Sequence, residues 1–197
     1  MTRPVYDDIA PHYEKVMRPL QRWFLLRLRA ETLSQLPENA RILEVGAGTG
    51  LNFIFYPAGA SGVASEFSHE MLRIAARKDK PSAVSLVENC AEFLPFRDHS
   101  FDAAFATLVF CSIHSPAQAF AELRRVVKPG GKVILLEHVR PRGLLGPFFD
   151  FLNFFTLRLF NDHFNRRTAK DAQQAGLTII RVDQHLGGII NLIACRV

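Results

Sequence analysis

Long apolar runs are absent from this sequence: none approaches the ~18 residues that a membrane-spanning helix needs. The opening residues, Met-Thr-Arg-Pro-Val-Tyr-Asp-Asp, lack the apolar core of a secretory signal peptide. Cysteine is scarce: there are three, Cys90, Cys111 and Cys195, which are widely separated and have no C-x-x-C spacing. These absences argue against a disulfide framework and a cysteine zinc site. They predict reduced thiols, no bound metal and a cytoplasmic location.

Net charge is also modest, at +5. Such a surplus permits attraction to an anionic lipid surface or to nucleic acid, but it is too small to choose between them. At 197 residues, with 48% hydrophobic and 22% charged residues, the chain has the size and composition of one globular domain. We therefore expect a single domain over residues 1–197, although the sequence does not indicate its oligomeric state.

The most informative stretch is Arg41-Ile-Leu-Glu-Val-Gly-Ala-Gly-Thr-Gly50. A short apolar run ends in a glycine-rich turn, and the apolar residues 51–56 favour the start of a helix. Strand, glycine turn and helix form the first unit of a doubly wound α/β sheet, where ligands bind beyond the carboxyl ends of the strands. Glycine suits this turn because a Cβ would hinder a positive φ or the approach of a ligand to the backbone.

The spacing of the glycines separates two classes of cofactor. A dinucleotide fingerprint is G-x-G-x-x-G, whereas the pattern here is Glu44-x-Gly46-x-Gly48-x-Gly50. This pattern resembles motif I of the class I S-adenosylmethionine (SAM)-dependent methyltransferases; a tight strand–helix turn in another α/β protein is the alternative. The resemblance implies SAM as cofactor and S-adenosylhomocysteine as product. It also implies a Rossmann-like α/β fold whose seven-stranded sheet is mostly parallel, with an antiparallel last strand.

A second strand is predicted over Gly62–Glu66, and it ends in an acid that lies 22 residues after Glu44. This is close to the position of the ribose-binding carboxylate of a doubly wound fold. A carboxylate suits the role because it accepts hydrogen bonds from both ribose hydroxyls. Residues 68–77 have helical character and form the next crossover.

The segment Cys90-Ala-Glu-Phe-Leu-Pro-Phe96 resembles the family's D-A-E-x-L-P-F loop, which lies along the adenine. Cys90 departs from the family pattern, which has at this place an aspartate that accepts the adenine amino group. The backbone N–H of Ala91 remains available to the ring, and Phe93 or Leu94 can pack against its face. The third and fourth strands are expected at 85–88 and 100–106.

The segment Thr107-Leu-Val-Phe-Cys-Ser-Ile-His114 follows the fourth strand, where the methyl acceptor meets the cofactor. It has neither the N/D-P-P-Y motif of base amino methyltransferases nor a Pro-Cys nucleophile, and its residues are mainly apolar. We therefore expect a small lipophilic acceptor and no nucleic-acid substrate. A helix is predicted over 117–127 and a sharp turn at Lys128-Pro-Gly-Gly131, before a fifth strand that ends near His138.

Residues 1–40 are expected to form a helical N-terminal cap, with an amphipathic stretch from about residue 14 to 36. Its apolar positions occur near helical spacing: Val16, Leu20, Trp23, Phe24 and Leu28. Four arginines are interleaved with them: Arg18, Arg22, Arg27 and Arg29. We interpret this as a helix on the sheet with a solvated basic face. The alternative is peripheral contact with an anionic membrane surface.

Residues 141–167 are rich in phenylalanine and are predicted to form a helical lid insertion. Most of these rings must be covered, because burying one contributes roughly 1.5–3 kcal/mol. They either pack on the sheet, line a pocket for a lipophilic substrate or form an interfacial patch. The chain ends in two β-rich runs about Gly187-Gly188, which predict a hairpin.

The resemblance implies a set of site residues. The expected cofactor-binding residues are Tyr6, Tyr13, Glu44, Gly46, Ala47, Gly48, Gly50, Glu66, Phe67, Cys90, Ala91, Glu92, Thr107 and Leu108. The expected catalytic residues are His138, His114 and Tyr13. Histidine suits a base or an orienting residue because its ordinary pKa lies near neutrality.

Three acceptors stay open within the family, because the sequence resembles quinone-pathway C-methyltransferases, bacterial phosphatidylethanolamine N-methyltransferases and thiol methyltransferase-like proteins. A phospholipid amine is the first candidate, and a thiol or a quinone ring is the alternative. Two hypotheses from other classes also remain. One is a non-catalytic SAM-binding protein, and the other is an NAD-dependent oxidoreductase, which the glycine spacing opposes.

Overall fold

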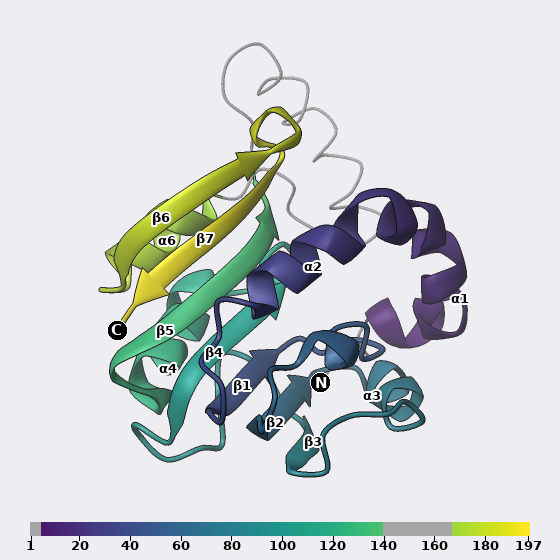
Figure 1. The fold of residues 1–197 in the computed structure, drawn as a ribbon, viewed down its shortest axis with the longest axis horizontal. Coiled ribbons are helices and arrows are strands. Elements are labelled where there is room, and N and C mark those ends of the chain that lie inside the picture. The colour runs from purple at the N-terminus through teal and green to yellow at the C-terminus, as the bar shows by residue number, and fades with distance from the viewer. Residues whose placement is uncertain (1–4, 140–166) are drawn as a thin grey trace.

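One twisted sheet of seven strands, in the order β3-β2-β1-β4-β5-β7-β6, forms the centre of the computed structural model (Figure 1). The structure describes residues 5–139 and 167–197. The strands are β1 (Arg41–Val45), β2 (Ser61–Glu66), β3 (Val84–Glu88), β4 (Phe101–Thr107), β5 (Val127–His138), β6 (Thr178–His185) and β7 (Ile190–Arg196).

The pairing of the strands confirms the predicted fold. β1 pairs in parallel with β2 and with β4, so that Glu44 lies opposite Ala64 on one side and Phe105 on the other. β7 runs antiparallel to both of its neighbours, β5 and β6. The central strands are apolar almost throughout because both of their faces are buried. The reversal of strand order between β1 and β4 opens the crevice in which such sheets bind ligands.

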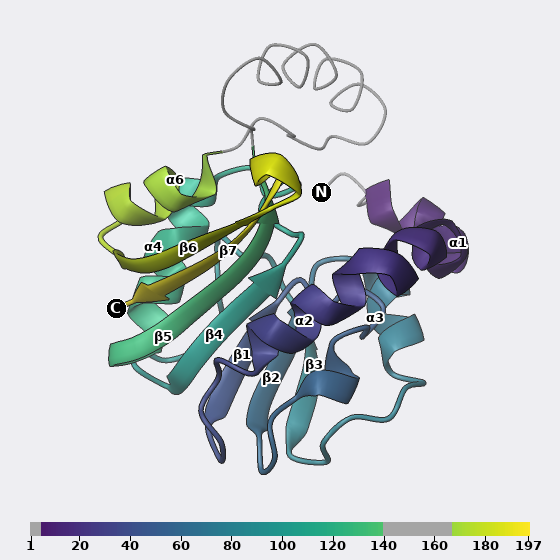
Figure 2. The same ribbon diagram turned by 45° about the horizontal axis from the view of Figure 1, so that its top comes forward.

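Helices cover both faces of the sheet (Figure 2). On one face lie α2 (Leu26–Leu33), the short 3-10 helix η2 (Phe53–Phe55) and α3 (His69–Ala75). On the other lie α4 (Pro116–Val126) and α6 (Thr168–Gln174), with Phe110 stacked on Phe120 at a centroid distance of 4.2 Å. The site at the carboxyl ends of the strands is thus supported by two packed layers.

The N-terminal segment is helical from α1 (Val5–Leu20) through a π-helical turn, η1 (Gln21–Leu25), into α2. The helix therefore starts about nine residues before the predicted amphipathic stretch and continues through Pro11 and Pro19. A wide π turn follows Pro19, whose ring nitrogen has no N–H to give to the preceding turn. Leu25 and Leu28 pack against β5 and β7. The predicted cap over the sheet is confirmed for this part of the chain.

Two local expectations need correction. The helix expected to start within residues 51–56 is limited to the three-residue 3-10 helix η2, which is flanked by turns. The side chains of Asn52 and Tyr56 both bond Glu44 on β1, and Pro57 follows, so the segment folds back onto the strand. Residues 128–131 belong to β5 as a bulge and not to a turn before it. Gly130, with φ of +78°, accommodates this bulge.

The predicted hairpin is confirmed: β6 and β7 are joined by a short 3-10 turn, η3 (Leu186–Gly188), in which Gly187 has φ of +64°. All but the last residue of the predicted Phe-rich lid, 141–167, lies outside the described residues, and Arg167 precedes α6. The single-domain assignment stays a prediction. Within residues 5–139 and 167–197, no helix is both long and apolar enough to span a bilayer.

Candidate functional site

The glycine turn after β1 is held in the left-handed region, with φ of +71° at Gly46, +56° at Gly48 and +79° at Gly50. A Cβ at Gly46 would lie 2.3 Å from Cγ2 of Val109, so the turn and the loop after β4 pack too tightly for a side chain. A Cβ at Gly48 would meet no atom within 4 Å. Gly48 therefore leaves space open beside its backbone, where a ligand can approach.

Glu66, at the end of β2, is bonded to this same turn. Its Oε2 accepts a hydrogen bond from the Gly48 N–H at 2.8 Å, and its Oε1 accepts from the N–H groups of Phe67 and Ser68 at 2.9 Å. Burial raises the pKa of Glu66, and the three N–H donors oppose that rise. The predicted ribose-binding acid is thus held beside the glycine turn, and the side chain of Phe67 is 47% exposed next to it.

Glu44 lies fully buried in the middle of the motif. Asn52 Nδ2 donates to its Oε1 and the Tyr56 hydroxyl donates to its Oε2. Burial raises the pKa of Glu44, against the lowering effects of Asn52, Tyr56 and Arg29. Both of its carboxyl oxygens bond side chains and, unlike the partly exposed Glu66, Glu44 has no exposed surface, so it holds the turn and the 3-10 helix against β1. Its direct contact with the cofactor stays a prediction.

Arg29 on α2 is the main site residue that the sequence reasoning missed. It was expected on a solvated basic face, but its side chain is 4% exposed. Its Nη1 donates to Asn52 Oδ1 at 2.7 Å and to Thr107 Oγ1 at 2.6 Å. Its Nε donates to Gln21 Oε1 at 3.2 Å. Burial lowers the pKa of Arg29, and the nearby Tyr13 and Glu44 oppose this, so a guanidinium faces Glu44 through Asn52.

This cluster, which we call the Arg29 network, consists of Gln21, Arg29, Glu44, Asn52, Tyr56 and Thr107. It joins the N-terminal helices to β1 and to the end of β4. Apart from Gln21 Nε2, its buried side-chain nitrogen and oxygen atoms are mostly partners for one another, as groups removed from water generally are. The N-terminal helices are thereby fixed directly over the predicted cofactor site.

The N-terminal helix α1 carries two predicted cofactor-binding residues, Tyr6 and Tyr13, and an acid, Asp7, that bonds α3. Tyr6 and Tyr13 are half-buried, and Tyr13 is close enough to Arg29 to raise its pKa. Asp7 accepts hydrogen bonds from the Ser68 hydroxyl and, at 3.3 Å, from the Glu70 N–H. Because Ser68 caps α3 and follows Glu66 closely, Asp7 ties the first helix to the β2 side of the site.

The loop after β3 carries the predicted adenine-side residues. Cys90 donates from Sγ to Glu92 Oε2 at 2.7 Å, and Glu92 Oε1 accepts from the Ser115 N–H at 3.1 Å. Burial, followed by the bond to Glu92, raises the pKa of the Cys90 thiol. Burial would raise the pKa of Glu92, but its hydrogen bonds with Cys90 and Ser115 lower it on balance. Glu92 therefore anchors the loop to the start of α4, and Ala91 lies half-buried between them.

At the acceptor end, Leu108 has φ of +60°, an unusual value for a branched side chain. Its N–H donates to Leu136 O at 2.7 Å. Glu137 is fully buried, and its two oxygens accept from the N–H groups of Val109, at 3.0 Å, and Phe110, at 3.2 Å. Glu137 thus holds the apolar loop after β4 in shape, a role that a lone glutamate at a strand end does not reveal in the sequence.

The two candidate histidines occupy different environments. His138 ends β5 and is half-buried, and burial lowers its pKa to about 4. The imidazole is therefore neutral at physiological pH and is a weak base. His114 follows the β4 loop and is exposed. The catalytic role of each stays a prediction.

The residues around the glycine turn fit SAM. Glu66 offers a carboxylate for a ribose diol, Phe67 offers an exposed ring for adenine, and the space beside Gly48 admits a chain close to the backbone. Acid, exposed ring and open backbone suit the ribose, the adenine and the methionine chain of a sulfonium nucleoside.

Comparisons with known proteins agree with this assignment. A family model described as a methyltransferase domain matches residues 43–135. A demethylmenaquinone methyltransferase of Renibacterium salmoninarum is 36% identical over 73% of this chain and 60% of its own length. The thiol S-methyltransferase TMT1B of Mus musculus is 29% identical over 92% of this chain and 80% of its own. A phosphatidylethanolamine N-methyltransferase of Cereibacter sphaeroides is 29% identical over 67% of this chain and 72% of its own length.

Among solved structures, a methyltransferase in complex with the Trm112 methyltransferase activator of Haloferax volcanii superposes with a TM-score of 0.81 at 17% identity. The superposition covers 100% of this chain and 99% of the chain in that structure. This likeness shows the fold. The chain spans about 60% of the length of the Renibacterium relative. From the glycine motif, the sheet order and these similarities together, the chain belongs to the class I SAM-dependent methyltransferases.

Proposed function

We propose that this protein transfers a methyl group from SAM to a small lipophilic acceptor. The observation that carries the proposal is the open backbone at Gly48 beside the backbone-held carboxylate of Glu66. Bound SAM supplies a methyl group on a positively charged sulfur. The chain supplies alignment: Glu66 orients the ribose and the glycine turn leaves room beside its backbone. The Arg29 network holds the N-terminal helices in place next to this site.

The acceptor end supports a lipophilic molecule. In the loop after β4, the apolar side chains of Leu108 and Val109 are half-buried, and Glu137 accepts hydrogen bonds from the backbone of that loop. Phe110 and Ile113, in the same loop, belong to the core packed against α4. An apolar surface beside the reacting groups excludes water, which favours displacement at carbon. The first candidate acceptor is a phospholipid amine of the phosphatidylethanolamine type, in keeping with the Cereibacter relative.

A thiol is the second candidate, favoured by two observations. His138, with its pKa lowered to about 4, is a weak base for an alkyl ammonium. A thiol, with a pKa near 8.5, loses its proton with little help, whereas an amine near 10 needs more. The similarity to the mouse thiol methyltransferase also extends over 92% of this chain. A quinone ring, as in the Renibacterium relative, is the third candidate.

Cofactor binding is tested first, by titrating SAM into the protein in a calorimeter. Glu66→Ala should weaken SAM binding by at least about tenfold, as expected for the loss of charge-assisted hydrogen bonds to the ribose. Glu88→Ala is the matched control, because Glu88 is the register partner of Glu66 on β3 but bonds the exposed His69. Unchanged SAM affinity in Glu66→Ala would refute the ribose assignment.

The acceptor is then identified by incubating the protein with SAM and, separately, phosphatidylethanolamine, an alkyl thiol and a quinol, followed by mass spectrometry. Methylated lipid supports the first candidate, and methylated thiol or quinol replaces it. SAM binding without any methylated product would favour the non-catalytic alternative. Quenching of NADH fluorescence by the protein, without SAM binding, would favour the oxidoreductase.

A further inference from the structure

The outer face of the N-terminal helices is unusually apolar and basic. Val16 is 73% exposed, Trp23 89% and Leu26 47%. Leu20, at 38%, lies in the same stripe. The sequence from residue 15 to residue 29 contains five cations and no Asp or Glu. We call this surface, made by Lys15, Val16, Arg18, Leu20, Arg22, Trp23, Leu26 and Arg27, the outer helical face.

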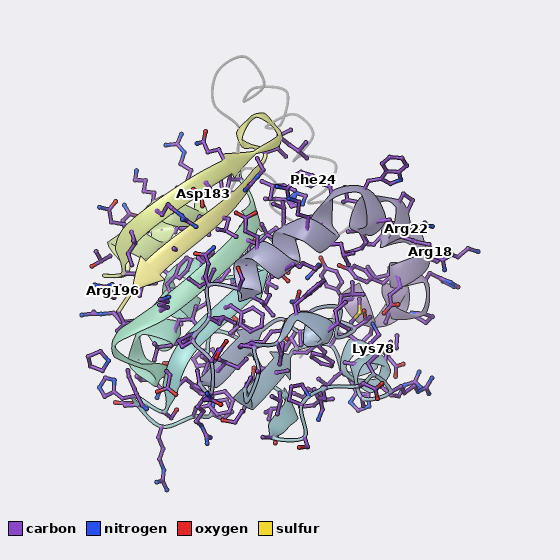
Figure 3. The ribbon with its side chains drawn as sticks, in the orientation of Figure 1. Arg18, Arg22, Phe24, Lys78, Asp183 and Arg196 are labelled. Atoms are coloured by element: carbon purple, nitrogen blue, oxygen red, sulfur yellow. The ribbon has the colours of Figure 1, made fainter. Side chains whose placement is uncertain are left out.

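Its cations are available. Lys15, Arg18, Arg22 and Arg27 are exposed, and none forms a hydrogen bond or salt bridge with another residue in the described ranges. The acid that precedes them, Glu14, forms a salt bridge with Lys78 and also attracts Arg18 electrostatically. Figure 3 shows Arg18 and Arg22 at the outer edge of these helices, whereas Phe24 lies toward the β6–β7 hairpin. Arg18, Pro19, Arg22 and Trp23 line an open hollow on this face.

The inner face of the same helices is committed to the protein. Leu25 and Leu28 pack against β5 and β7, Phe24 meets His185 edge-on with ring centroids 6.4 Å apart, and Arg29 enters the network. The helices therefore need the outer residues neither for packing nor for the site. An exposed indole beside the exposed guanidinium groups of Arg22 and Arg27 is suited to one environment above others: the interface of an anionic bilayer, where indole lies at headgroup depth and arginine binds lipid phosphates.

We propose that the outer helical face docks the protein on an anionic lipid surface. The docking itself does not depend on the proposed function, but its benefit to the enzyme does. Because the N-terminal helices lie next to the cofactor site, docking them would give a lipophilic acceptor a short path from the bilayer to that site. A second copy of the chain is a poorer occupant, because a two-fold pairing of this face would bring the same arginines together. Nucleic acid is a poorer one as well, because it would leave Val16 and Leu20 exposed.

Trp23 is the single tryptophan of the chain, so intrinsic tryptophan fluorescence reports on this face alone. The 197-residue protein, without SAM or acceptor, is titrated with phosphatidylcholine vesicles and with vesicles that also contain phosphatidylglycerol. We expect a blue shift and protection from a water-soluble quencher with the anionic vesicles only, reversed by added salt. Co-sedimentation measures the affinity in parallel.

Arg18→Gln/Arg22→Gln should bind the anionic vesicles about 25-fold more weakly, or about fivefold per arginine. Arg97→Gln/Arg196→Gln removes the same charge from exposed positions in the loop before β4 and at the end of β7, and should bind as the parent does. Trp23→Ala should weaken binding roughly tenfold. Ile54→Ala, at a position 74% exposed on η2, is its control and should have no effect.

Several outcomes would overturn the proposal: co-sedimentation without a fluorescence shift, equal losses in the control pair, or a blue shift that depends on protein concentration and not on lipid. Equal or tighter binding to duplex DNA would do so as well. Vesicle binding with no methylated product would leave this inference standing and defeat the proposed function. Methyl transfer without vesicle binding would do the reverse.

Discussion

Replacing Arg29 by methionine tests whether the N-terminal helices are held over the site by charge. The guanidinium is 4% exposed and donates three hydrogen bonds, to Gln21, Asn52 and Thr107. Methionine has a similar length but no donor, so it leaves Gln21 Oε1 and Asn52 Oδ1 buried without a partner, whereas Thr107 Oγ1 still accepts from Asn52 Nδ2. It also leaves Glu44 without a nearby cation. Breaking one side of a buried charged cluster costs about 3–5 kcal/mol of folding free energy.

The measurement is urea unfolding at neutral pH, followed by circular dichroism and extrapolated to water. We expect Arg29→Met to lower the free energy of unfolding by about 3–5 kcal/mol and Arg27→Met, at an exposed position in the same helix, to change it by less than about 0.5 kcal/mol.

Glu44→Gln then completes a double-mutant cycle. If the two charges act together through Asn52, Arg29→Met should cost at least about 1 kcal/mol less in the Glu44→Gln background than in the parent. Additive single effects, within about 0.5 kcal/mol, would refute the coupling. A loss below about 1 kcal/mol in Arg29→Met would refute the structural importance of the arginine itself.

Two further predictions concern Gly48 and His138. Gly48→Ala forces a side chain into φ of +56° and costs about 1–2 kcal/mol, and its Cβ also enters the space open to the cofactor. SAM affinity by calorimetry should therefore fall at least tenfold in Gly48→Ala. Gly130→Ala, with φ of +78° and equally open surroundings, should lose stability but not affinity. Similar SAM affinities in the two variants would contradict the placement of the cofactor. For His138, the folded-state pKa of about 4 lies below the ordinary 6.5, so the unfolded chain binds more protons between these values. Stability should fall as the pH is lowered from 6.5 toward 4, by at most about 3 kcal/mol, and His138→Gln should flatten this dependence in urea unfolding at several pH values. A parallel pH profile in the variant would show that His138 is not responsible.

The sequence by itself determined the elements whose signal is local. The apolar run at 42–45 and the closely spaced glycines specify a strand and a turn, because positive φ excludes most other residues there. Glu66 was found for the same reason: parallel strands place their carboxyl ends at one edge, so an acid that ends the second strand must lie beside the first turn. The hairpin about Gly187 is equally local.

Only the tertiary structure decided which stripe of the N-terminal helix faces inward. Val16, Leu20 and Trp23 form one helically spaced stripe, and Phe24 and Leu28 belong to another beside it, so periodicity alone allows either to pack on the sheet. The sheet accepts the second stripe, which leaves the first exposed and carries Arg29 inward while Arg27 stays in solvent.

Arg29 was counted as a surface arginine because its partners, Asn52 and Thr107, are 23 and 78 residues away in the chain. Glu137 was missed for the same reason, since its bonds run to a loop 28 and 27 residues before it. A buried charge is tolerated only where distant groups supply its hydrogen bonds. Such long-range pairs form only when the helices and loops pack onto the sheet. Local sequence patterns therefore do not indicate them.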